Sequence, residues 1–396
     1  MITVTGGVYR EKCFDQPTNE ILGSGGRAAI ALTDLAKIRL YTYRAKEFSG
    51  HFHELEQAFL VESEGLWTEW GIEFDYLYSL GAPRITPTPA TITQHPDLIV
   101  EGDVILRFGM LEGSARISGN RVVYDPQSAF NPRPFSENGS TAKTLAVILN
   151  REEGWGLTGK NDPGEIAEVL LSDWGAQVVV VKMGTHGAMV VTREGSPALV
   201  PAYRSEQVWK LGSGDVFSAV FTYFWGLGKR DPIEAAELAS RATAYYCAVG
   251  SVPLPSDHRS WAADAPPTSK RTGKVYLASP FFTLGERWLV NQVRDQLMSM
   301  GMEVFSPLHD VGEGPAISVA KPDLDGLDEC SVVLAIMNGN DPGTIFEVGY
   351  AIAKEKPIIC LAQNVPEEDL KMPAGSGCRV YNNIVTAIYQ TVWAEP

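Results

Sequence analysis

The chain has 396 residues, of which 44% are hydrophobic, and its formal net charge is -15. That length exceeds what one hydrophobic core usually holds, so two domains are expected. The acidic balance excludes the basic surface that nucleic-acid binders need. It still allows small anionic ligands, which need only a local patch or a helix N-terminus.

Five cysteines are scattered along the chain without a CxxC pair, so we interpret them as reduced core residues. The N-terminus lacks the pattern of a signal peptide. No apolar run approaches the ~20 residues of a membrane span. These features predict a cytoplasmic protein without a membrane or nucleic-acid partner.

The first 250 residues predict a mainly parallel sheet with helices on both faces. Short apolar runs rich in β-branched residues occur at 103–109, 121–126, 144–150, 176–184 and 188–192. A helical pattern, "DPGEIAEVLLSDWG", lies between two of them. Strands that are apolar throughout and alternate with helices are typical of a sheet covered on both faces.

Two histidines stand close together in "GHFHELE", at His51 and His53. On a strand they would point the same way. A metal site needs further ligands that the sequence does not reveal, so we interpret both as surface or substrate-lid residues.

The stretch "LGSGD", Leu211 to Asp215, precedes a strongly apolar helix. Small residues at a helix N-terminus leave backbone N–H groups free to hold a phosphate. An Asp at the edge of such a loop is suited to accept the proton of an attacking hydroxyl. The alternative is that Asp215 only caps the helix.

This part of the chain resembles the PfkB/ribokinase family of sugar and nucleoside kinases. The matching motifs are Gly212-Ser213-Gly214-Asp215, Asn150-Arg151-Glu152-Glu153, Lys182 to Ala188, Tyr124-Asp125-Pro126 and Gly25-Gly26. The resemblance implies a ribokinase-like fold that uses ATP and Mg²⁺, with Asp215 as general base. It also implies an anion hole at Gly212, Ser213 and Gly214.

By the same resemblance, Asn150 and Glu153 would organise phosphate and Mg²⁺, Glu153 indirectly. Gly25, Gly26 and Glu11 would lie on the sugar side. The chain departs from the family at three places: Ile30 replaces a sugar-binding Asn, Lys182 replaces a Thr, and Trp209-Lys210-Leu211 replaces D-T-T. We therefore expect either a kinase for an unusual substrate, such as a nucleoside, or a domain that only binds its ligand.

Residues 251–273 have the composition of a linker, rich in Pro, Ser and Ala, and Trp261 is expected to anchor it to one domain. The predicted domains are 1–250 and 274–396. The second repeats the strand–helix alternation and predicts a small, doubly wound, flavodoxin-like α/β domain.

The second domain carries acids near predicted strand ends. Thr344 and Glu347 form a T-x-x-E capping box, which would account for Glu347 alone. Asp341 and Asp323 are not explained in this way, nor is the strand end "YLASPFF". Carboxylates beside an aromatic strand end suit a reaction at a sugar carbon, with one as nucleophile and another as acid.

The motifs "YLASPFF", "VFSP", "DLDGLDEC" and "DPGTIFEVGYA" resemble those of the nucleoside 2-deoxyribosyltransferase family. The resemblance implies that Glu347 forms a glycosyl-enzyme intermediate without a cofactor. Asp341 and Asp323 would position the sugar and protonate the base, Tyr276 would orient Glu347, and Phe281 or Phe282 would stack near the base. It also implies a homo-oligomer. Asp310 is either part of a loop over the site or a plain turn acid.

The sequence thus predicts a two-domain enzyme that processes a nucleoside, nucleotide or sugar. The C-terminal domain would cleave or exchange an N-glycosidic bond, and the N-terminal domain would be a kinase with altered sugar contacts. One alternative is a degenerate kinase domain that senses a ligand for an N-glycosidase, including one that depletes nucleotides such as NAD. Another is an active kinase with a C-terminal binding module.

Overall fold

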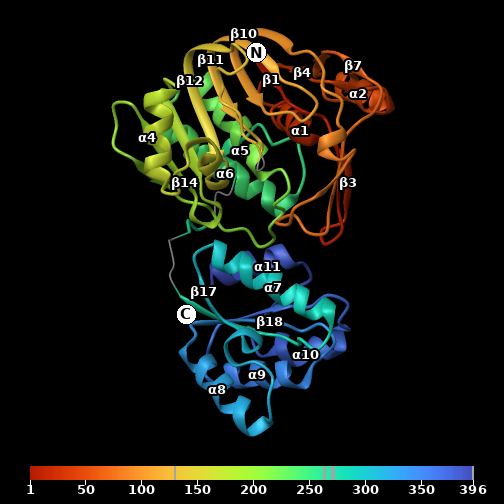
Figure 1. Cartoon of the computed structure of the whole chain (residues 1–396), viewed down its shortest axis with the longest axis vertical. Coiled ribbons are helices and arrows are strands. Elements are labelled where there is room, and N and C mark those ends of the chain that lie inside the picture. The colour runs from red at the N-terminus through yellow and green to blue at the C-terminus, as the bar shows by residue number, and fades with distance from the viewer. Residues whose placement is uncertain (129–130, 262–264, 269–272, 395–396) are drawn as a thin grey trace. The chain divides into compact units, whose positions relative to one another are not determined.

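The computed structural model describes residues 1–128, 131–261, 265–268 and 273–394. The chain divides into two compact units (Figure 1). Unit 1 comprises Met1–Ser205 with Trp209–Thr268, and unit 2 comprises Glu206–Val208 with Ser269–Pro396. The boundaries expected from the sequence stay a prediction, and parts of the expected linker, 262–264 and 269–272, lie outside the described residues.

Unit 1 is built on a nine-stranded sheet of order β15-β14-β13-β12-β11-β10-β1-β4-β6. The strands are β1 (Ile2–Thr5), β4 (Ile38–Tyr41), β6 (Glu62–Glu64), β10 (Leu98–Phe108), β11 (Ala115–Asp125), β12 (Thr141–Asn150), β13 (Val178–Lys182), β14 (Ala188–Thr192) and β15 (Ala198–Val200). The pairs from β6 to β13 are parallel, and β14 and β15 join antiparallel. This confirms the predicted parallel-rich sheet.

Both faces of this sheet are covered, because its strands are apolar on both sides. One core packs against α1 (Gly23–Ala31), α5 (Ser213–Phe221) and α6 (Pro232–Val249). A second core on the other face includes α4 (Pro163–Asp173). Trp261 is buried in the first core, as expected of the residue that anchors the linker.

Smaller elements complete unit 1. A four-stranded sheet has the order β3-β2-β8-β9, and β5 pairs with β7. The four-stranded sheet consists of β2 (Arg10–Cys13), β3 (Thr18–Ile21), β8 (Glu73–Tyr76) and β9 (Arg84–Thr86), and the pair consists of β5 (Arg44–Ala45) and β7 (Trp67–Thr68). Further helices are α2 (Ser49–Gln57), α3 (Arg151–Thr158) and the π-helical η4 (Thr222–Leu227). His51 and His53 lie on α2, so the strand considered for them is wrong and they do not point the same way.

Unit 2 is a five-stranded parallel sheet of order β17-β16-β18-β19-β20. Its elements are β16 (Lys274–Ala278), β17 (Glu303–Phe305), β18 (Val332–Ile336), β19 (Ile358–Leu361), β20 (Arg379–Tyr381), α7 (Leu284–Ser299), α8 (Ala316–Glu329), α9 (Pro342–Ala353), α10 (Glu367–Gly375) and α11 (Ile384–Val392). In chain order the strands run 2-1-3-4-5, the flavodoxin-like arrangement, which confirms the predicted fold class.

The five cysteines are free and buried, in agreement with their interpretation as reduced core residues. Among the described residues, no helix is both long and apolar enough to cross a membrane.

Candidate active sites

The N-terminus of α5 forms the floor of the first site. Gly212 is the N-cap residue with φ 77°, a left-handed conformation that favours glycine. No side chain caps the helix, and Asp215 lies inside its first turn. The alternative that Asp215 is a helix cap is therefore wrong.

Both carboxylate oxygens of Asp215 accept hydrogen bonds. Arg27 Nη1 donates to Oδ2 at 2.8 Å, and Gln127 Nε2 donates to Oδ1 at 3.0 Å. Burial raises the pKa of Asp215 to about 6, and the positive charge of Arg27 acts in the opposite direction. Asp215 is thus a buried carboxylate that is held by two donors.

Arg27 also reaches Glu11, because its Nη2 donates to Glu11 Oε2 at 2.6 Å. The arginine side chain is only 1% exposed, so the three residues form a buried Glu11–Arg27–Asp215 triad. A Cβ on Gly212 would lie 2.2 Å from Arg27 Nε, so the glycine leaves room for the guanidinium. The sequence reasoning missed Arg27, although it is the one charged residue in the helix "GSGGRAAIA".

The double glycine lies at the start of α1. Gly25 donates its N–H to the carbonyl of Gly7 at 3.0 Å, and a Cβ there would lie 2.5 Å from the carbonyl oxygen of Gly6. Gly26 has no such close neighbour. Gly25 therefore allows the helix to approach the loop after β1, which brings Arg27 to the site.

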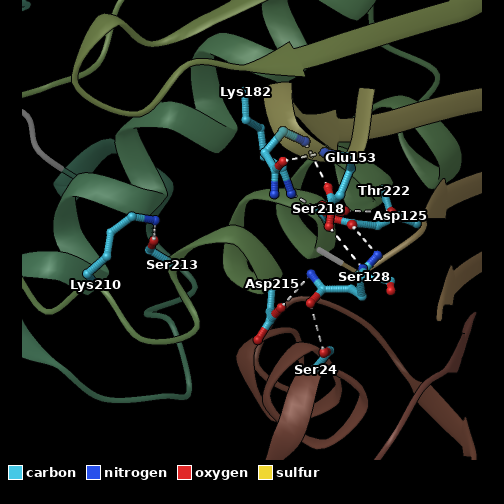
Figure 2. A network of polar contacts seen from close by, with 12 residues as sticks. Ser24, Asp125, Ser128, Glu153, Lys182, Lys210, Ser213, Asp215, Ser218 and Thr222 are labelled. Carbon is cyan, nitrogen blue, oxygen red and sulfur yellow. Dashed lines mark hydrogen bonds and ion pairs between the residues drawn. The ribbon is translucent and has the colours of Figure 1, made fainter. Parts of the chain in front are cut away.

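A polar network connects this site to the carboxyl ends of β11, β12 and β13 (Figure 2). Asp125 ends β11 and accepts hydrogen bonds at Oδ2 from Lys182 Nζ and Ser218 Oγ, both at 2.7 Å. Gln127, with φ 48°, turns toward Asp215 and also accepts from Ser24 Oγ at 3.3 Å. Ligands bind at this edge in open α/β sheets.

The Asn150-x-x-Glu153 motif forms a capping box at the start of α3. Asn150 Oδ1 accepts the N–H of Glu153 at 2.9 Å, and Glu153 Oε2 accepts the N–H of Asn150 at 2.8 Å. The other oxygen of Glu153 accepts the N–H of Ser128 at 3.1 Å. Burial and the nearby charge of Asp125 raise the pKa of Glu153 to about 7.

These contacts decide whether the predicted Mg²⁺ finds carboxylate ligands here. Glu153 uses both oxygens for backbone N–H groups, and Asp125 accepts from Lys182, Ser218 and the N–H of Gln127. Among the described residues, no group of three His, Cys, Asp or Glu side chains is placed to hold a metal ion. The arrangement does not fit a Mg²⁺ held directly by Asp125 or Glu153, and the indirect role expected for Glu153 stays a prediction.

The second site lies in unit 2, where β16 and β18 are neighbours and the chain order of the strands reverses. Tyr276 on β16 donates its Oη hydrogen to Glu347 Oε1 on α9 at 2.7 Å. Tyr276 is fully buried and stacks on Phe305, with ring centroids 5.5 Å apart. Such topological switch points are where α/β sheets bind ligands.

Two further carboxylates lie within electrostatic reach of Glu347. Burial raises the pKa of Glu347 to about 7, the Tyr276 hydrogen bond lowers it, and the charges of Asp323 and Asp341 raise it. The Oδ1 atom of Asp323 is buried without a hydrogen-bond partner, and burial raises the pKa of this carboxyl. The structure thus brings Tyr276, Asp323, Asp341 and Glu347 together.

The capping box expected at α9 is wrong. Asp341 is the N-cap residue, and its Oδ2 accepts the N–H of Thr344 at 2.7 Å and the Thr344 hydroxyl at 3.0 Å. The helix starts one turn earlier than the T-x-x-E pattern requires, because Pro342 suits the first helical position. Glu347 is therefore not used as a cap.

The aromatic pair after β16 is exposed to different degrees. Phe281 is half-buried, Phe282 is 70% exposed, and their ring centroids lie 5.1 Å apart. Asp310 lies on the π-helical turn η6 (Pro307–Val311) and accepts the N–H of Ser306 at 2.7 Å, as expected of a turn acid.

Two family models match the chain. Residues 112–256 match the pfkB family carbohydrate kinases, and residues 275–379 match the nucleoside 2-deoxyribosyltransferases. A PfkB-type kinase domain is fused to a nucleoside 2-deoxyribosyltransferase-type domain. The first match contains Asp125, Glu153, Lys182 and Asp215, and the second contains Tyr276, Asp323, Asp341 and Glu347.

Solved structures of two sugar kinases are similar to part of this chain. A ribokinase from Thermotoga maritima is 18% identical, with a TM-score of 0.50, over 66% of this chain and 99% of that chain. A fructokinase from Vibrio cholerae O395 is 15% identical, with a TM-score of 0.49, over 66% and 99%. The first of these shows the ribokinase-like fold of the N-terminal unit.

One curated relative, an uncharacterized protein of Ureaplasma parvum serovar 3, is 26% identical over 99 residues. The match covers 22% of this chain and 63% of that protein. The chain thus spans less than two thirds of the relative's length.

Proposed function

We propose that the C-terminal domain breaks the N-glycosidic bond of a nucleoside or nucleotide, with Glu347 as the nucleophile. The hydrogen bond of 2.7 Å between Tyr276 Oη and Glu347 Oε1 carries this proposal. It orients the carboxylate and favours its ionised form, which is the form that attacks. Among the described residues, Glu347 Oε2 has no hydrogen-bond partner, so this oxygen is free to react.

In the first step, Oε2 of Glu347 attacks C1′ of the sugar as the bond from C1′ to the base nitrogen breaks. The bonding pair leaves with the base, which takes up a proton. Asp323 is the proposed donor, because its Oδ1 atom is buried without a partner and burial raises the pKa of this carboxyl, which makes it easier to protonate. Asp341 holds the start of α9 and supplies a further negative charge near the sugar.

In the second step, an acceptor attacks C1′ as the bond between C1′ and Glu347 breaks, and the proton that the acceptor loses returns to Asp323. Water as the acceptor makes the domain an N-glycosidase, and a second base makes it a transferase. The chemistry at Glu347 is the same in both cases.

For the N-terminal domain we propose phosphoryl transfer to a hydroxyl of a sugar or nucleoside. Asp215 would accept the hydroxyl proton, while the backbone at the start of α5 would stabilise the charge on the transferred phosphoryl group. The description of the matching family as carbohydrate kinases supports this reaction class. The buried position of Asp215 supports its role as a base, because burial brings its pKa to about 6, close to neutral pH.

A second candidate for this domain is a ligand sensor without phosphotransfer. It is favoured by the Glu11–Arg27–Asp215 triad, in which a guanidinium already pairs with the proposed base. A neutral hydroxyl would have to compete with Arg27 for Asp215. Formation of a phosphorylated product separates the two candidates, because only the kinase forms one.

The test is chromatography of nucleosides, nucleotides and NAD after incubation with the purified protein, ATP and Mg²⁺, with and without a second free base. Released or exchanged base should appear with wild type and disappear in Glu347→Gln. It should persist in Glu355→Gln, a control at an exposed glutamate just beyond α9. If Glu347→Gln retains full activity, the glycosidic proposal is wrong. ADP with a phosphorylated product that is lost in Asp215→Asn supports the kinase, and its absence supports the sensor.

A further inference from the structure

The side chain of Lys182 lies next to the proposed phosphate site at the start of α5, which we call the phosphate cradle. We propose that the ammonium group of Lys182 takes the place of a divalent metal ion, so that this domain binds phosphate groups without Mg²⁺. The inference rests on the proposed phosphate site at the start of α5, and it specifies how that site recognises its ligand.

The position of Lys182 is the first support. It is the last residue of β13, and its Nζ pairs with Asp125 at 2.7 Å. The same Nζ lies 3.4 Å from where a Cβ on Gly214 would be. The ammonium group therefore stands between the carboxylate at the strand edge and the first turn of α5 (Figure 2).

The second support is that the carboxylates of Asp125 and Glu153 already accept hydrogen bonds. Asp125 is completely buried, and its Oδ2 already accepts from Lys182 and Ser218. Each oxygen of Glu153 accepts a backbone N–H. A Mg²⁺ ion requires oxygen ligands in near-octahedral geometry. To bind here it would have to lie beside the ammonium group of Lys182, on oxygens that already accept hydrogen bonds.

Lys210 is the third support. Its Nζ donates to Ser213 Oγ at 2.7 Å, and no ion pair joins it to a carboxylate among the described residues. Burial lowers its pKa, and the charge of Lys182 acts in the same direction, so the two ammonium groups act on the same region. Lys182 and Lys210 thus provide two positive charges at the start of α5, and only that of Lys182 is paired.

Lys182 also has a simpler role, which is to neutralise Asp125. That role alone predicts that substitution of Lys182 lowers stability without changing the metal dependence of phosphate binding. The two roles differ in calorimetry with pyrophosphate and with ADP, each measured in Mg²⁺ and in EDTA. The proteins would be wild type, Lys182→Thr, Lys210→Gln and, as an exposed lysine control, Lys160→Gln.

We expect wild type and Lys160→Gln to bind pyrophosphate equally well, within threefold, in Mg²⁺ and in EDTA. Lys182→Thr should lose about tenfold or more in EDTA, the effect of one charge-assisted hydrogen bond, and recover in Mg²⁺. Lys210→Gln breaks no ion pair and should weaken binding about tenfold in both buffers. If Lys182→Thr does not fold, binding by wild type and Lys210→Gln in the two buffers still tests whether phosphate binding depends on Mg²⁺.

Binding of wild type that is at least tenfold stronger in Mg²⁺ would overturn the inference and leave the cradle in place. No binding of either probe in either buffer would overturn the cradle and the inference together. Metal-independent binding without any phosphorylated product would uphold the inference while the proposed phosphotransfer fails. Lys182→Thr that binds like wild type in EDTA would reduce Lys182 to its structural role.

Discussion

Replacing Arg27 by Met tests the buried triad without knowledge of a substrate. The substitution keeps an apolar stem but removes the guanidinium that pairs with Glu11 at 2.6 Å and with Asp215 at 2.8 Å. Both carboxylates are buried, so they would lose their ion-pair partner. Breaking a buried ion pair in this way costs about 3–5 kcal/mol. We expect a loss of that size in the unfolding free energy of unit 1 at pH 8.

The loss should shrink at low pH. Without Arg27 the pKa of Asp215 rises above its present value of about 6, so the carboxyl takes up a proton more readily. At pH 5 the neutral form is easily reached, and the missing cation then matters less. Arg27→Met should therefore lose more unfolding free energy, relative to wild type, at pH 8 than at pH 5.

The assay is urea unfolding followed by hydrogen exchange in peptides of α1 and α5, which reports on unit 1 separately. The control is Arg39→Met, which removes a solvent-accessible pair with Glu62, where a much smaller loss is expected. If Arg27→Met costs no more than this control, or costs more at pH 5 than at pH 8, the reasoning about the triad is refuted.

Three other predictions concern both domains. The kcat/KM of the wild-type glycosidic reaction should rise with pH through about 7, because Glu347 must ionise. Tyr276→Phe removes a hydrogen bond that lowers the pKa of Glu347, so the rise should move to higher pH and the rate at pH 7 should fall about tenfold. An unchanged pH profile would contradict this prediction. Gly212→Ala should cost at least about 2 kcal/mol through its positive φ and the buried guanidinium beside it, whereas Gly159→Ala, with a similar φ and no close neighbour, should cost about 1 kcal/mol; equal losses would argue against the contact. Burial raises the pKa of Glu112 to about 7, so its stabilising effect is present at acidic pH and lost as pH rises through 7; Glu112→Gln should reduce the fall in stability between pH 5 and 8 by about 2–3 kcal/mol, as measured by urea unfolding at both pH values.

The fold class was readable because its signals are local. Apolar β-branched runs and the helical pattern at 162–175 correspond to β10 through β14 and α4. The alternation after residue 273 led to the five-stranded parallel sheet of unit 2. Where a local signal was ambiguous, the sequence left the structure open: "GHFHELE" lies on the helix α2, where Phe52 and Leu55 bury the same helical face.

The motifs also led to candidate residues, although not to their contacts. Thr344 and Glu347 have the spacing of a capping box, but Asp341 takes the cap and Glu347 meets Tyr276 instead. Asn150 and Glu153 form the capping box of α3, a contact that the motif did not predict, and their expected role with phosphate and Mg²⁺ stays a prediction.

Local patterns in the amino-acid sequence are enough to predict most strands and helices and to place the motifs at strand ends. Which charged side chains meet depends on tertiary packing. Arg27 and Asp215 are 188 positions apart, and Tyr276 and Glu347 are 71 apart. No local pattern encodes such pairs, because they form only when the sheet brings distant strand ends and helix N-termini to one edge. The environment of each carboxylate, and with it the chemistry it can perform, is set by that long-range packing.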